Sequence, residues 1–520
     1  MKQLLSSSIA APGFYGLNTQ ESSITLSSGF ALKADNCVID QYGRLGARKG
    51  YAYQTTSGGT GSNIRGIHEF VGSTGYVDTI SWGNNNIYSG TSTLTPLVTG
   101  ITITDDRWSA ATLNGVVYLT QAGHPMLAID SALNVTTHSA TQYSFVTSAY
   151  GKLWAGGATN NHTVYGTNLL GSFSGGLDLD LREVWTNGGD AIVSVEGFNG
   201  RLIVICKKSI VILGDNDDTD LGISPVNLRV LDVLENVGCV AKASIQAVGD
   251  DLFFLSQTGL RSLNRVIQEK SNPLTDLSTN VRDELVQVIN SSTNDYITSV
   301  YSPTDAFYLL IFPATNLVYC FDTRGRLENG GLRVTKWTNS PILCGTHINS
   351  SLCLGLANGI AKYSTYTDDS SSYFLSYHTN YFDFDQPTVN KILKTVGITL
   401  IGGSGQTFVV KVGTDYTDTP RSYIRNVKQS SVSEYAHPDA LIFETWGPAV
   451  GGETYDSGDP SVTTTVAGTA MYTGGGSTDR IKVAVGGSGS VLQLGFEADI
   501  AGDQLSIQKF DVYVKQGRTN

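Results

Sequence analysis

A strand–turn–strand pattern recurs through the first two thirds of the chain. Its clearest copies place Asn114-Gly115, Tyr150-Gly151, Asn199-Gly200 or Gly249-Asp250 between two apolar runs. Asn-Gly between such runs predicts a β-hairpin, because a type I′ turn needs positive φ at both central residues. Together with looser copies near positions 75, 305 and 350, the turns follow one another every 36 to 55 residues. A repeat of this length predicts an array of small β-sheets.

The repeat predicts an all-β fold whose main part is a β-propeller of about six to seven blades. Each apolar run is often followed by a second hairpin arm, which gives a four-stranded unit. Units that stack around an axis are buried on both faces, so their strands read as continuous apolar runs. The 58 Gly residues and the 15% share of charged residues suit such a turn-rich protein. A multi-sheet sandwich with accidental spacing is the alternative.

One helix is expected inside the propeller, near residues 274–289. Pro273 and Ser278 offer helix-start signals, and apolar residues recur at the spacing of one helix face. These apolar positions are Leu274, Leu277, Val281, Leu285, Val288 and Ile289. The inserted helix accounts for the longest interval between turns.

The repeat ends near Tyr363, and the serine-rich stretch 364–372 is typical of a linker. The segments that follow, including 394–401, 407–413, 481–485, 492–496 and 505–514, alternate with period two, as half-exposed antiparallel strands do. We therefore expect three parts: residues 1–60 as an extended N-terminal platform segment, 61–365 as the propeller, and 366–520 as a C-terminal β-sandwich.

Charge and cysteine usage exclude several classes of protein. The net charge of −12 and a pI near 5.0 argue against a protein that reads DNA or RNA, because such proteins are usually basic. They do not exclude a protein through which DNA merely passes. None of the six cysteines forms a CxxC pair, so buried free thiols made in a reducing compartment are expected. No apolar stretch reaches 18 residues, so no membrane span is expected.

Motifs for catalysis or cofactor binding are scarce. The chain has no P-loop, HExxH, zinc-ligand quartet or GxSxG elbow, and its seven histidines show no ligand spacing, so we expect no cofactor and no metal. Asp215–Asp220 resembles the start of a calcium loop, but Asp220 and Val226 stand where that loop needs Gly and Glu. A solvated acidic turn is the simpler interpretation.

An enzymatic alternative rests on one acidic segment. Asp178 and Asp180 lie on one face of an expected strand, and Glu183 and Trp185 follow. Two carboxylates beside an aromatic ring suit a glycosidase, which needs an acid together with a base or nucleophile. A polar loop is the simpler interpretation, and no sialidase-type SxDxGxTW box repeats along the blades.

Three segments at the two ends of the chain carry a family resemblance. They are Gly13–Tyr51, with its GLN and GRLGARKG motifs, then Thr379–Lys394, and finally Leu505–Arg518. In layout they resemble the tail tubular protein B, or tail nozzle, family of short-tailed bacteriophages. Propeller-bearing tail hub proteins of other short-tailed phages would give nearly the same features. Long members of the family carry inserted domains that this compact chain lacks, so its division into parts can differ from theirs.

The resemblance implies a non-enzymatic virion protein, synthesised in the cytoplasm of the host bacterium and assembled into the phage tail. It implies a homohexameric ring that conducts and gates genomic DNA without binding it specifically, with an adaptor ring and tail fibres as partners. The sequence does not assign the gate residues; glycine-rich loops such as Gly474–Gly476 are candidates only. Glycan cleavage and glycan binding by the propeller are the alternatives. The resemblance implies adaptor docking by Phe14, Tyr15, Gly16, Leu17, Asn18, Arg44 and Arg48.

Overall fold

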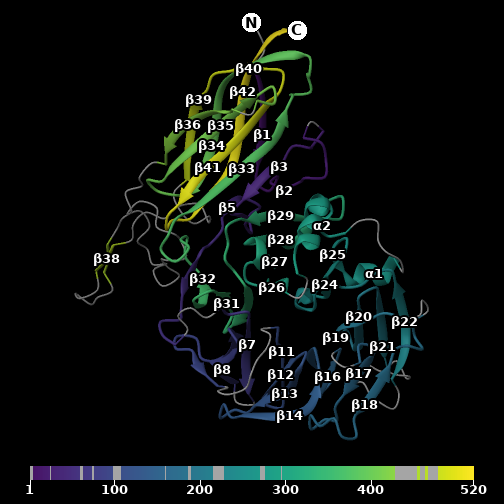
Figure 1. Cartoon of the computed structure of the whole chain (residues 1–520). Helices are drawn as coiled ribbons and strands as arrows, with labels where there is room; N and C mark the ends of the chain where they lie inside the picture. The colour runs from purple at the N-terminus through teal and green to yellow at the C-terminus, as the bar shows by residue number, and fades with distance from the viewer. Residues whose placement is uncertain are drawn as a thin grey trace. The chain divides into compact units, whose positions relative to one another are not determined.

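The computed structural model divides the chain into two compact units (Figure 1). Unit 1 combines Met1–Gly50 with Ser364–Asn520, and unit 2 is Tyr51–Tyr363. The structure describes residues 4–23, 25–58, 63–72, 75–97, 107–157, 160–185, 189–214, 228–269, 276–293, 296–417, 419–427, 454–456, 463–465 and 478–519.

Unit 2 is a β-propeller, as the repeat predicts. Within its described residues, the strands form six four-stranded blades and one three-stranded blade, numbered here 1 to 7 along the chain. Blades 1 to 4 comprise β7 (Gly66–Gly72), β8 (Gly75–Gly83), β9 (Asn86–Ser89) and β10 (Thr95–Pro96); β11 (Ser109–Leu113), β12 (Val116–Gln121), β13 (His124–Ile129) and β14 (Val135–Gln142); β15 (Phe145–Ala149), β16 (Lys152–Gly156), β17 (Thr163–Gly166) and β18 (Leu177–Asp180); and β19 (Ile192–Phe198), β20 (Arg201–Cys206), β21 (Ser209–Gly214) and β22 (Arg229–Glu235).

The remaining blades close the ring. The first strand of the unit completes the last blade, because β6 pairs with β32 from Tyr51↔Tyr363 to Tyr53↔Ala361. Blades 5 to 7 comprise β23 (Gln246–Val248), β24 (Asp251–Ser256) and β25 (Gly259–Ser262); β26 (Thr298–Ser302), β27 (Phe307–Phe312), β28 (Leu317–Arg326) and β29 (Leu332–Trp337); and β30 (Cys344–Ile348), β31 (Ser351–Leu356), β32 (Gly359–Tyr363) and β6 (Tyr51–Tyr53).

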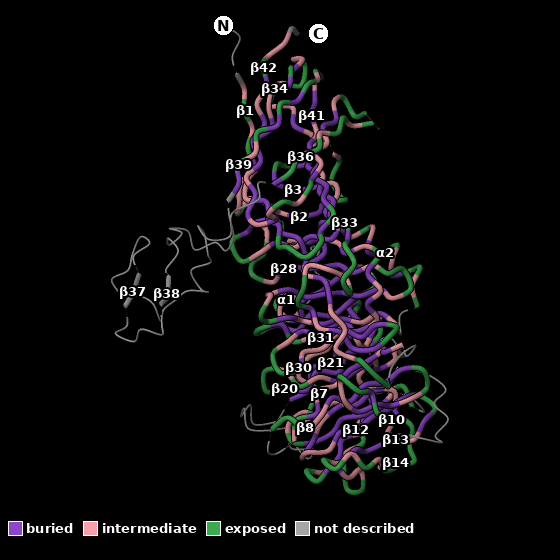
Figure 2. The backbone as a smooth tube through the Cα atoms, turned by 90° about the vertical axis from the view of Figure 1, so that its left-hand side faces the viewer, coloured by how far each residue is buried: buried purple, intermediate pink, exposed green. Residues whose placement is uncertain are grey.

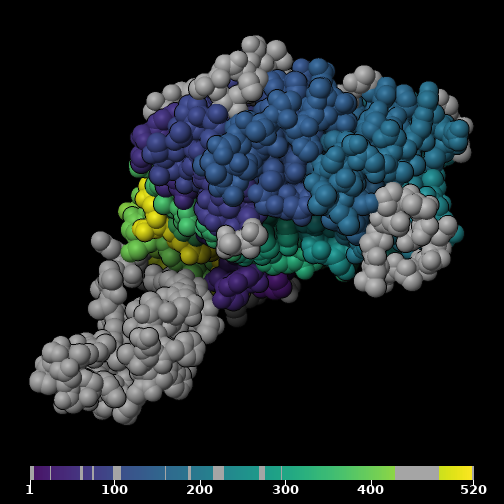
Figure 3. All heavy atoms as spheres, turned by 90° about the horizontal axis from the view of Figure 1, so that it is seen from below, coloured from purple at the N-terminus to yellow at the C-terminus, as the bar shows by residue number. Residues whose placement is uncertain are grey.

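Buried side chains join each blade to the next. Each of five buried clusters draws on two neighbouring blades, and one of them joins blade 7 back to blade 1 through Ile348 and Ile67. Figure 2 shows the resulting buried core along the strands, and Figure 3 shows the first four blades, in purple to blue, as one continuous surface. Because both faces of a blade are covered, burial of apolar area stabilises the ring, at about 25 cal/mol per Å².

The predicted hairpin turns are confirmed by their backbone angles. Asn114 and Gly115 have φ of 52° and 75°, and Asn199 and Gly200 have φ of 48° and 72°. Each turn joins the innermost strand of a blade to the next strand. Asn and Gly occupy these positions because they tolerate positive φ better than other residues do.

The helical insertion is confirmed, with different bounds. A 3-10 turn, η2 (Thr279–Val281), leads into helix α2 (Arg282–Ser291), whose buried face carries Leu285 and Ile289. Residues 270–275, which include the expected start, lie outside the described residues. A shorter helix that the sequence analysis did not predict, α1 (Leu263–Glu269), follows the three-stranded blade and contacts β24.

Unit 1 contains two β-sheets built from both ends of the chain. One sheet has the order β39-β34-β42-β5-β4, with β1 beside β42 and β40 beside β34; the other includes β2, β3, β33, β41, β35 and β36 in that order. A separate two-stranded sheet pairs β37 with β38. The strands are β1 (Leu4–Ala10), β2 (Gly16–Leu17), β3 (Phe30–Asp35), β4 (Cys37–Ile39), β5 (Leu45–Ala47), β33 (Tyr373–Phe382), β34 (Val389–Gly402), β35 (Thr407–Thr414), β36 (Arg421–Asn426), β37 (Thr454–Asp456), β38 (Thr463–Thr465), β39 (Thr478–Ala484), β40 (Ser488–Gly489), β41 (Leu492–Ile500) and β42 (Leu505–Thr519).

The N-terminal segment differs from the expected separate platform. β1 runs antiparallel to β42 over seven residue pairs, and β3 pairs with β33. Residues 1–50 therefore complete the sheets of the C-terminal part, and residues 51–60 fall in the propeller unit. The physical reason is that isolated N-terminal strands would leave unpaired backbone groups, which the long C-terminal strands satisfy.

All six cysteines are buried free thiols, as predicted. Among the described residues, no helix has the length and apolar character needed to cross a membrane.

Candidate docking segment

The first predicted docking residues form part of the core of unit 1. Phe14 is fully buried, with its ring centroid 6.1 Å from that of Tyr377 on β33 and 6.2 Å from that of Phe510 on β42. Leu17 is also fully buried, on the short strand that pairs with β3. These two side chains join the N-terminal segment to strands near the other end of the sequence.

Asn18 ends this short strand with a local turn. Its side-chain oxygen accepts hydrogen bonds from the backbone N–H groups of Gln20 and Glu21, and its amide nitrogen donates to the Glu21 carboxylate at 3.0 Å. An Asn side chain that caps its own following backbone is a turn-forming device. Asn18 is only 1% exposed, so its role within the unit is structural.

Arg44 is held inside the hairpin between β4 and β5. Its Nε donates to the Asp40 carboxylate at 2.6 Å, and the same carboxylate accepts the backbone N–H groups of Tyr42 and Arg44. The guanidinium lies 4.2 Å from the ring centroid of Tyr42. Arg44 itself is buried, but Tyr42 is 47% exposed, so this turn presents an aromatic ring on a rigid support.

Arg48 makes the most extensive set of contacts in the segment. Its two terminal nitrogens donate to the two carboxylate oxygens of Asp368 at 2.8 and 2.6 Å, and its Nε donates to Asn36 at 3.1 Å. The guanidinium also lies 4.1 Å from the ring centroid of Tyr373, whose hydroxyl donates to the Arg48 carbonyl. Paired, planar hydrogen bonds of this kind are both strong and directional.

The Arg48–Asp368 pair lies where the chain leaves unit 1 and returns to it. Gly50 donates its backbone N–H to Thr365, and Ser364 donates to the Gly50 carbonyl at 3.3 Å. A Cβ at Gly50 would lie 2.1 Å from the Thr367 carbonyl oxygen, so this crossing requires glycine. The stretch predicted as a linker thus begins with an ordered crossing of two chain segments.

The structure brings all seven predicted residues into unit 1 but buries six of them. Only Tyr15 is partly exposed, beside the ring of Phe30. Tyr42, the exposed ring of the segment, was not among the predicted residues, although it stands between Asp40 and Arg44, whose carboxylate–guanidinium spacing could have indicated a rigid turn. Most of the predicted residues therefore pack inside unit 1, and the exposed ring of Tyr42 lies at its surface.

The acidic segment of the enzymatic alternative lies largely exposed at the outer edge of its blade. Asp178 and Asp180 lie on β18, the outer strand of its blade, and both are exposed, as is Glu183, while Trp185 is buried. Arg182 pairs with Asp180 at 2.5 Å, and its hydrogen bonds hold the pKa of that carboxyl at about 2. A general acid for glycoside cleavage needs a raised pKa, so Asp180 does not suit that role.

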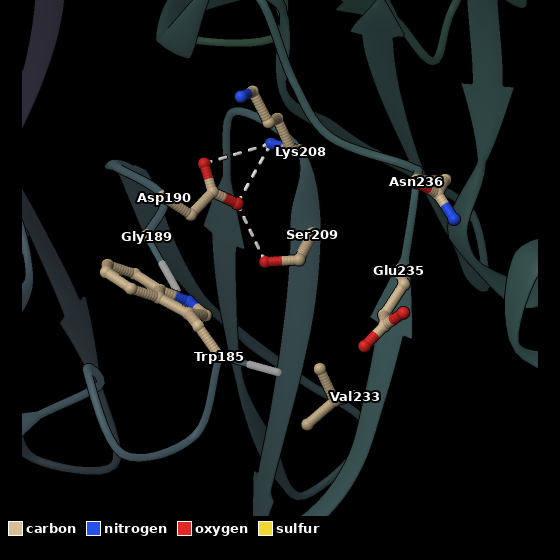
Figure 4. Close-up of a pocket in the computed structure, with 8 residues that line it drawn as sticks. All are labelled: Trp185, Gly189, Asp190, Lys208, Ser209, Val233, Glu235 and Asn236. Carbon is tan, nitrogen blue, oxygen red and sulfur yellow. Dashed lines mark hydrogen bonds between the residues drawn. The ribbon is translucent and has the colours of Figure 1, made fainter. Parts of the chain in front are cut away.

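Trp185 instead lines a small cavity with Asp190 and Glu235 (Figure 4). The Asp190 carboxylate accepts the backbone N–H of Lys208 at 3.0 Å and the hydroxyl of Ser209 at 2.8 Å. The cavity volume is about 70 Å³. Small-molecule sites usually start at roughly 300 Å³, so this cavity suits a few water molecules rather than a sugar.

The structure does not describe two of the predicted loops. These are the calcium-loop candidate at 215–220 and the gate candidate at 474–476. Among the residues that the structure describes, no group of three or more His, Cys, Asp or Glu side chains could hold a metal ion.

Comparisons with known proteins find only distant structural similarity. No protein-family model and no curated protein matches the chain. The computationally designed Ika8 protein is 12% identical, with 66% of this chain and 98% of that chain covered and a TM-score of 0.36. BamB from Moraxella catarrhalis is 12% identical, with 69% and 97% covered and a TM-score of 0.36. PorZ of the type-IX secretion system of Porphyromonas gingivalis is 15% identical, with 58% and 37% covered and a TM-score of 0.32. These similarities are too distant to assign the chain to a family.

Proposed function

We propose that the chain is a structural virion protein that forms the distal nozzle of a short phage tail. The observation that carries the proposal is the convergence of the three family-like segments. Although they lie at opposite ends of the sequence, strands from all three pair directly in unit 1: β3 with β33, and β5 and β34 with β42. The propeller is then an insertion between two halves of one unit.

The charge of the chain suits a conduit for DNA. Proteins that hold DNA neutralise its phosphates with Lys and Arg, and this chain has 34 such residues against 46 Asp and Glu. A ring of such subunits would repel the DNA backbone, so the genome could pass without adhering. In this proposal six copies of the chain form a homohexameric ring closed by head-to-tail contacts. The adaptor and the tail fibres bind to this homohexamer. The protein has no catalytic role.

Docking to the adaptor is assigned to the turn around Tyr42. Buried Arg44 and half-buried Asp40 fix this turn, and Tyr42 places a large amphipathic ring at the surface, the kind of side chain enriched in interfaces. Tyr42→Ser should abolish adaptor binding and lower the free energy of unfolding by no more than about 1 kcal/mol, the size of its exposed cation–π contact with Arg44. Tyr76→Ser, which removes a ring of similar exposure from the propeller, is the matched control. Equal binding by both variants would contradict the assignment.

The oligomeric state tests the proposal as a whole. Negative-stain microscopy of the purified chain, alone and mixed with a candidate adaptor protein, should show six-fold rings. Monomers that hydrolyse a polysaccharide would overturn the nozzle function and favour the glycan-cleaving alternative. That alternative has weak support in the described residues, because its carboxylates are exposed on an outer strand and its tryptophan lines only a small cavity.

A further inference from the structure

The exposed large apolar side chains of the propeller gather at one end of its blades. Because neighbouring strands of a blade run antiparallel, the turn after its first strand and the turn after its third lie at the same end, which we call the hairpin end. Val71 and Tyr76 flank the first turn of blade 1, Leu169 and Leu170 lie in the turn between β17 and β18 of blade 3, and Val230 stands at the start of β22 in blade 4. Among the described residues of the propeller, no other large apolar side chain is exposed.

The hairpin ends of successive blades face the same side of the ring. In a propeller the innermost strands all run in one direction, so their following turns lie together. The Tyr150 hydroxyl, in the first turn of blade 3, donates to the Arg201 carbonyl, in the first turn of blade 4, at 2.7 Å. Asn114, in the first turn of blade 2, donates its side-chain amide to the Leu169 carbonyl at 3.0 Å. The five exposed apolar side chains therefore share one side of the propeller.

The turn of blade 3 carries the most exposed of these side chains. Leu169 is 64% exposed and Leu170 is 84% exposed. Asn168 closes the turn, because its side-chain oxygen accepts the backbone N–H groups of Leu170 at 2.9 Å and of Ser172 at 3.0 Å, and its carbonyl accepts the N–H of Gly171 at 3.0 Å. Gly, Pro, Asn, Asp and Ser dominate turn positions, so the turn itself does not require two leucines at its tip.

Blade 2 fixes the backbone of this turn. Besides the bond from Asn114 to the Leu169 carbonyl, Nε2 of His138 lies 2.8 Å from the Gly171 carbonyl oxygen, to which it can donate a hydrogen bond. Gly171 has φ of 79°, and a Cβ there would lie 2.9 Å from the Tyr118 hydroxyl, so the packing requires glycine. The two leucines thus project from a turn that is already ordered, and little freedom is lost when they are covered.

Charge and area indicate what covers the hairpin end. Residues 163–177 contain no charged side chain, and the neighbouring turns contribute charges of both signs, Asp130 and Arg201. A stable protein partner usually covers about 800 Å² of continuous surface, whereas these apolar side chains stand as separate tips on blades 1, 3 and 4. A lipid surface is fluid, so it accepts separate apolar tips without a matching pocket for each.

We propose that the hairpin end of the propeller binds an electrically neutral lipid surface. Leu169 and Leu170 insert between the headgroups and the acyl chains, and Val71, Tyr76 and Val230 make further apolar contact at the interface. The net charge of −12 disfavours anionic lipids, so attraction to the bilayer is apolar and not electrostatic. This contact needs only the propeller, and therefore stands whether or not six copies form a ring.

Flotation of the full chain with phosphatidylcholine vesicles tests the proposal. The wild-type chain should float with the vesicles at low and at high salt, and Leu169→Ser should weaken its vesicle affinity by about tenfold or more. Ile424→Ser is the matched control, because Ile424 is also 64% exposed but lies on β36 of unit 1. This control should keep the wild-type affinity, and circular dichroism with the melting temperature establishes that both variants are folded.

A fluorescent side chain at the tip adds a positive readout. Leu170→Trp should shift its emission to shorter wavelengths when phosphatidylcholine vesicles are added, because the indole enters a less polar environment. Ile424→Trp should show no such shift. The difference spectrum against the wild-type chain removes the contribution of its own six tryptophans.

Four results would overturn the assignment. The first is a wild-type chain that does not float, and the second is equal vesicle affinity of Leu169→Ser and wild type. The third is flotation that requires anionic lipid and disappears at high salt, which would indicate electrostatic attraction. The fourth is a wild-type dimer in gel filtration that Leu169→Ser dissociates, which would show that a second copy of the chain covers the hairpin end.

Discussion

Arg48 is the residue on which the crossing between the two halves of unit 1 depends most. It is 2% exposed, and its charge is balanced by Asp368, 320 positions later. The motif around Arg48 could be singled out from the sequence, but its partner could not, because pairing over such a separation leaves no local pattern. The Asp lies in a serine-rich stretch whose composition indicates a linker.

Removal of that partner should be costly. Asp368→Ala leaves a buried, uncompensated guanidinium, so we expect the free energy of unfolding to fall by about 3 kcal/mol. Urea titration followed by circular dichroism measures the loss. Asp35→Ala is the control, because its partner Lys33 is 43% exposed and 3.6 Å away, and such pairs contribute about 0–1 kcal/mol. Similar losses in both variants would contradict the role given to the Arg48 pair.

A pH dependence should arise from Glu196. Burial raises the pKa of its carboxyl from the ordinary value of 4.5 to about 7. The folded chain therefore holds a proton that the unfolded chain releases, so the free energy of unfolding falls as pH rises from about 4.5 to about 7 and then levels off. Glu196→Gln should remove this decline and be more stable than wild type at pH 8 by about 3 kcal/mol, since each pKa unit corresponds to about 1.4 kcal/mol.

Urea titrations at pH 5 and pH 8 check this prediction. Asp178→Asn removes an exposed carboxyl on the outer strand of the neighbouring blade and should keep the wild-type dependence. If Glu196→Gln retains the full decline, another group is responsible.

At the scale of the elements, local chemistry decided what the sequence could predict. The Asn-Gly and Tyr-Gly turns were predicted because a two-residue hairpin places demands on φ that few residues meet. The start of α2 was harder to predict, since apolar spacing also continues through the preceding 3-10 turn at Thr279–Val281. β1 was not recognised as a sheet strand, because its serine-rich sequence depends on β42 for pairing.

The hairpin turns give a prediction of their own. Gly200 has φ of 72°, where a Cβ costs about 1–2 kcal/mol, so Gly200→Ala should lower the free energy of unfolding by that amount. Gly325→Ala is the matched control, because a Cβ there meets no atom within 4 Å and the residue does not have positive φ. Chemical denaturation of both variants measures the difference, and equal stabilities would contradict a strict turn requirement.

At the scale of the whole molecule, the repeat predicted the propeller, but the grouping of the two chain ends could not be read from it. Intervals between turns report which strands are neighbours in sequence, and propeller blades are made of such neighbours. The sheets of unit 1 join strands from the first 50 and the last 157 residues, as defined by Met1–Gly50 and Ser364–Asn520. Only the family-like segments at both ends hinted that these parts belong together.

The insertion predicts independent folding of the propeller. Tyr51 and Tyr363 are paired strand residues, so the ring closes with its own first and last residues. A fragment of residues 51–363 should be monomeric in gel filtration and should unfold in one cooperative transition. Removal of 51–53 from that fragment should lower its melting temperature, since β32 then loses its partner. An aggregated 51–363 fragment beside a soluble full chain would contradict this prediction.

The position of β42 has a consequence for the order of events during synthesis. The propeller strands leave the ribosome before β42 does, so the ring can close while the chain is still growing. β1, β5 and β34 must wait, because their shared partner is translated last among the described strands. A chain whose translation stops before Leu505 would carry a finished propeller on an unfinished sandwich. In the proposed virion role, competence for assembly would then be conferred by β42, and prematurely terminated chains would be left out of the tail.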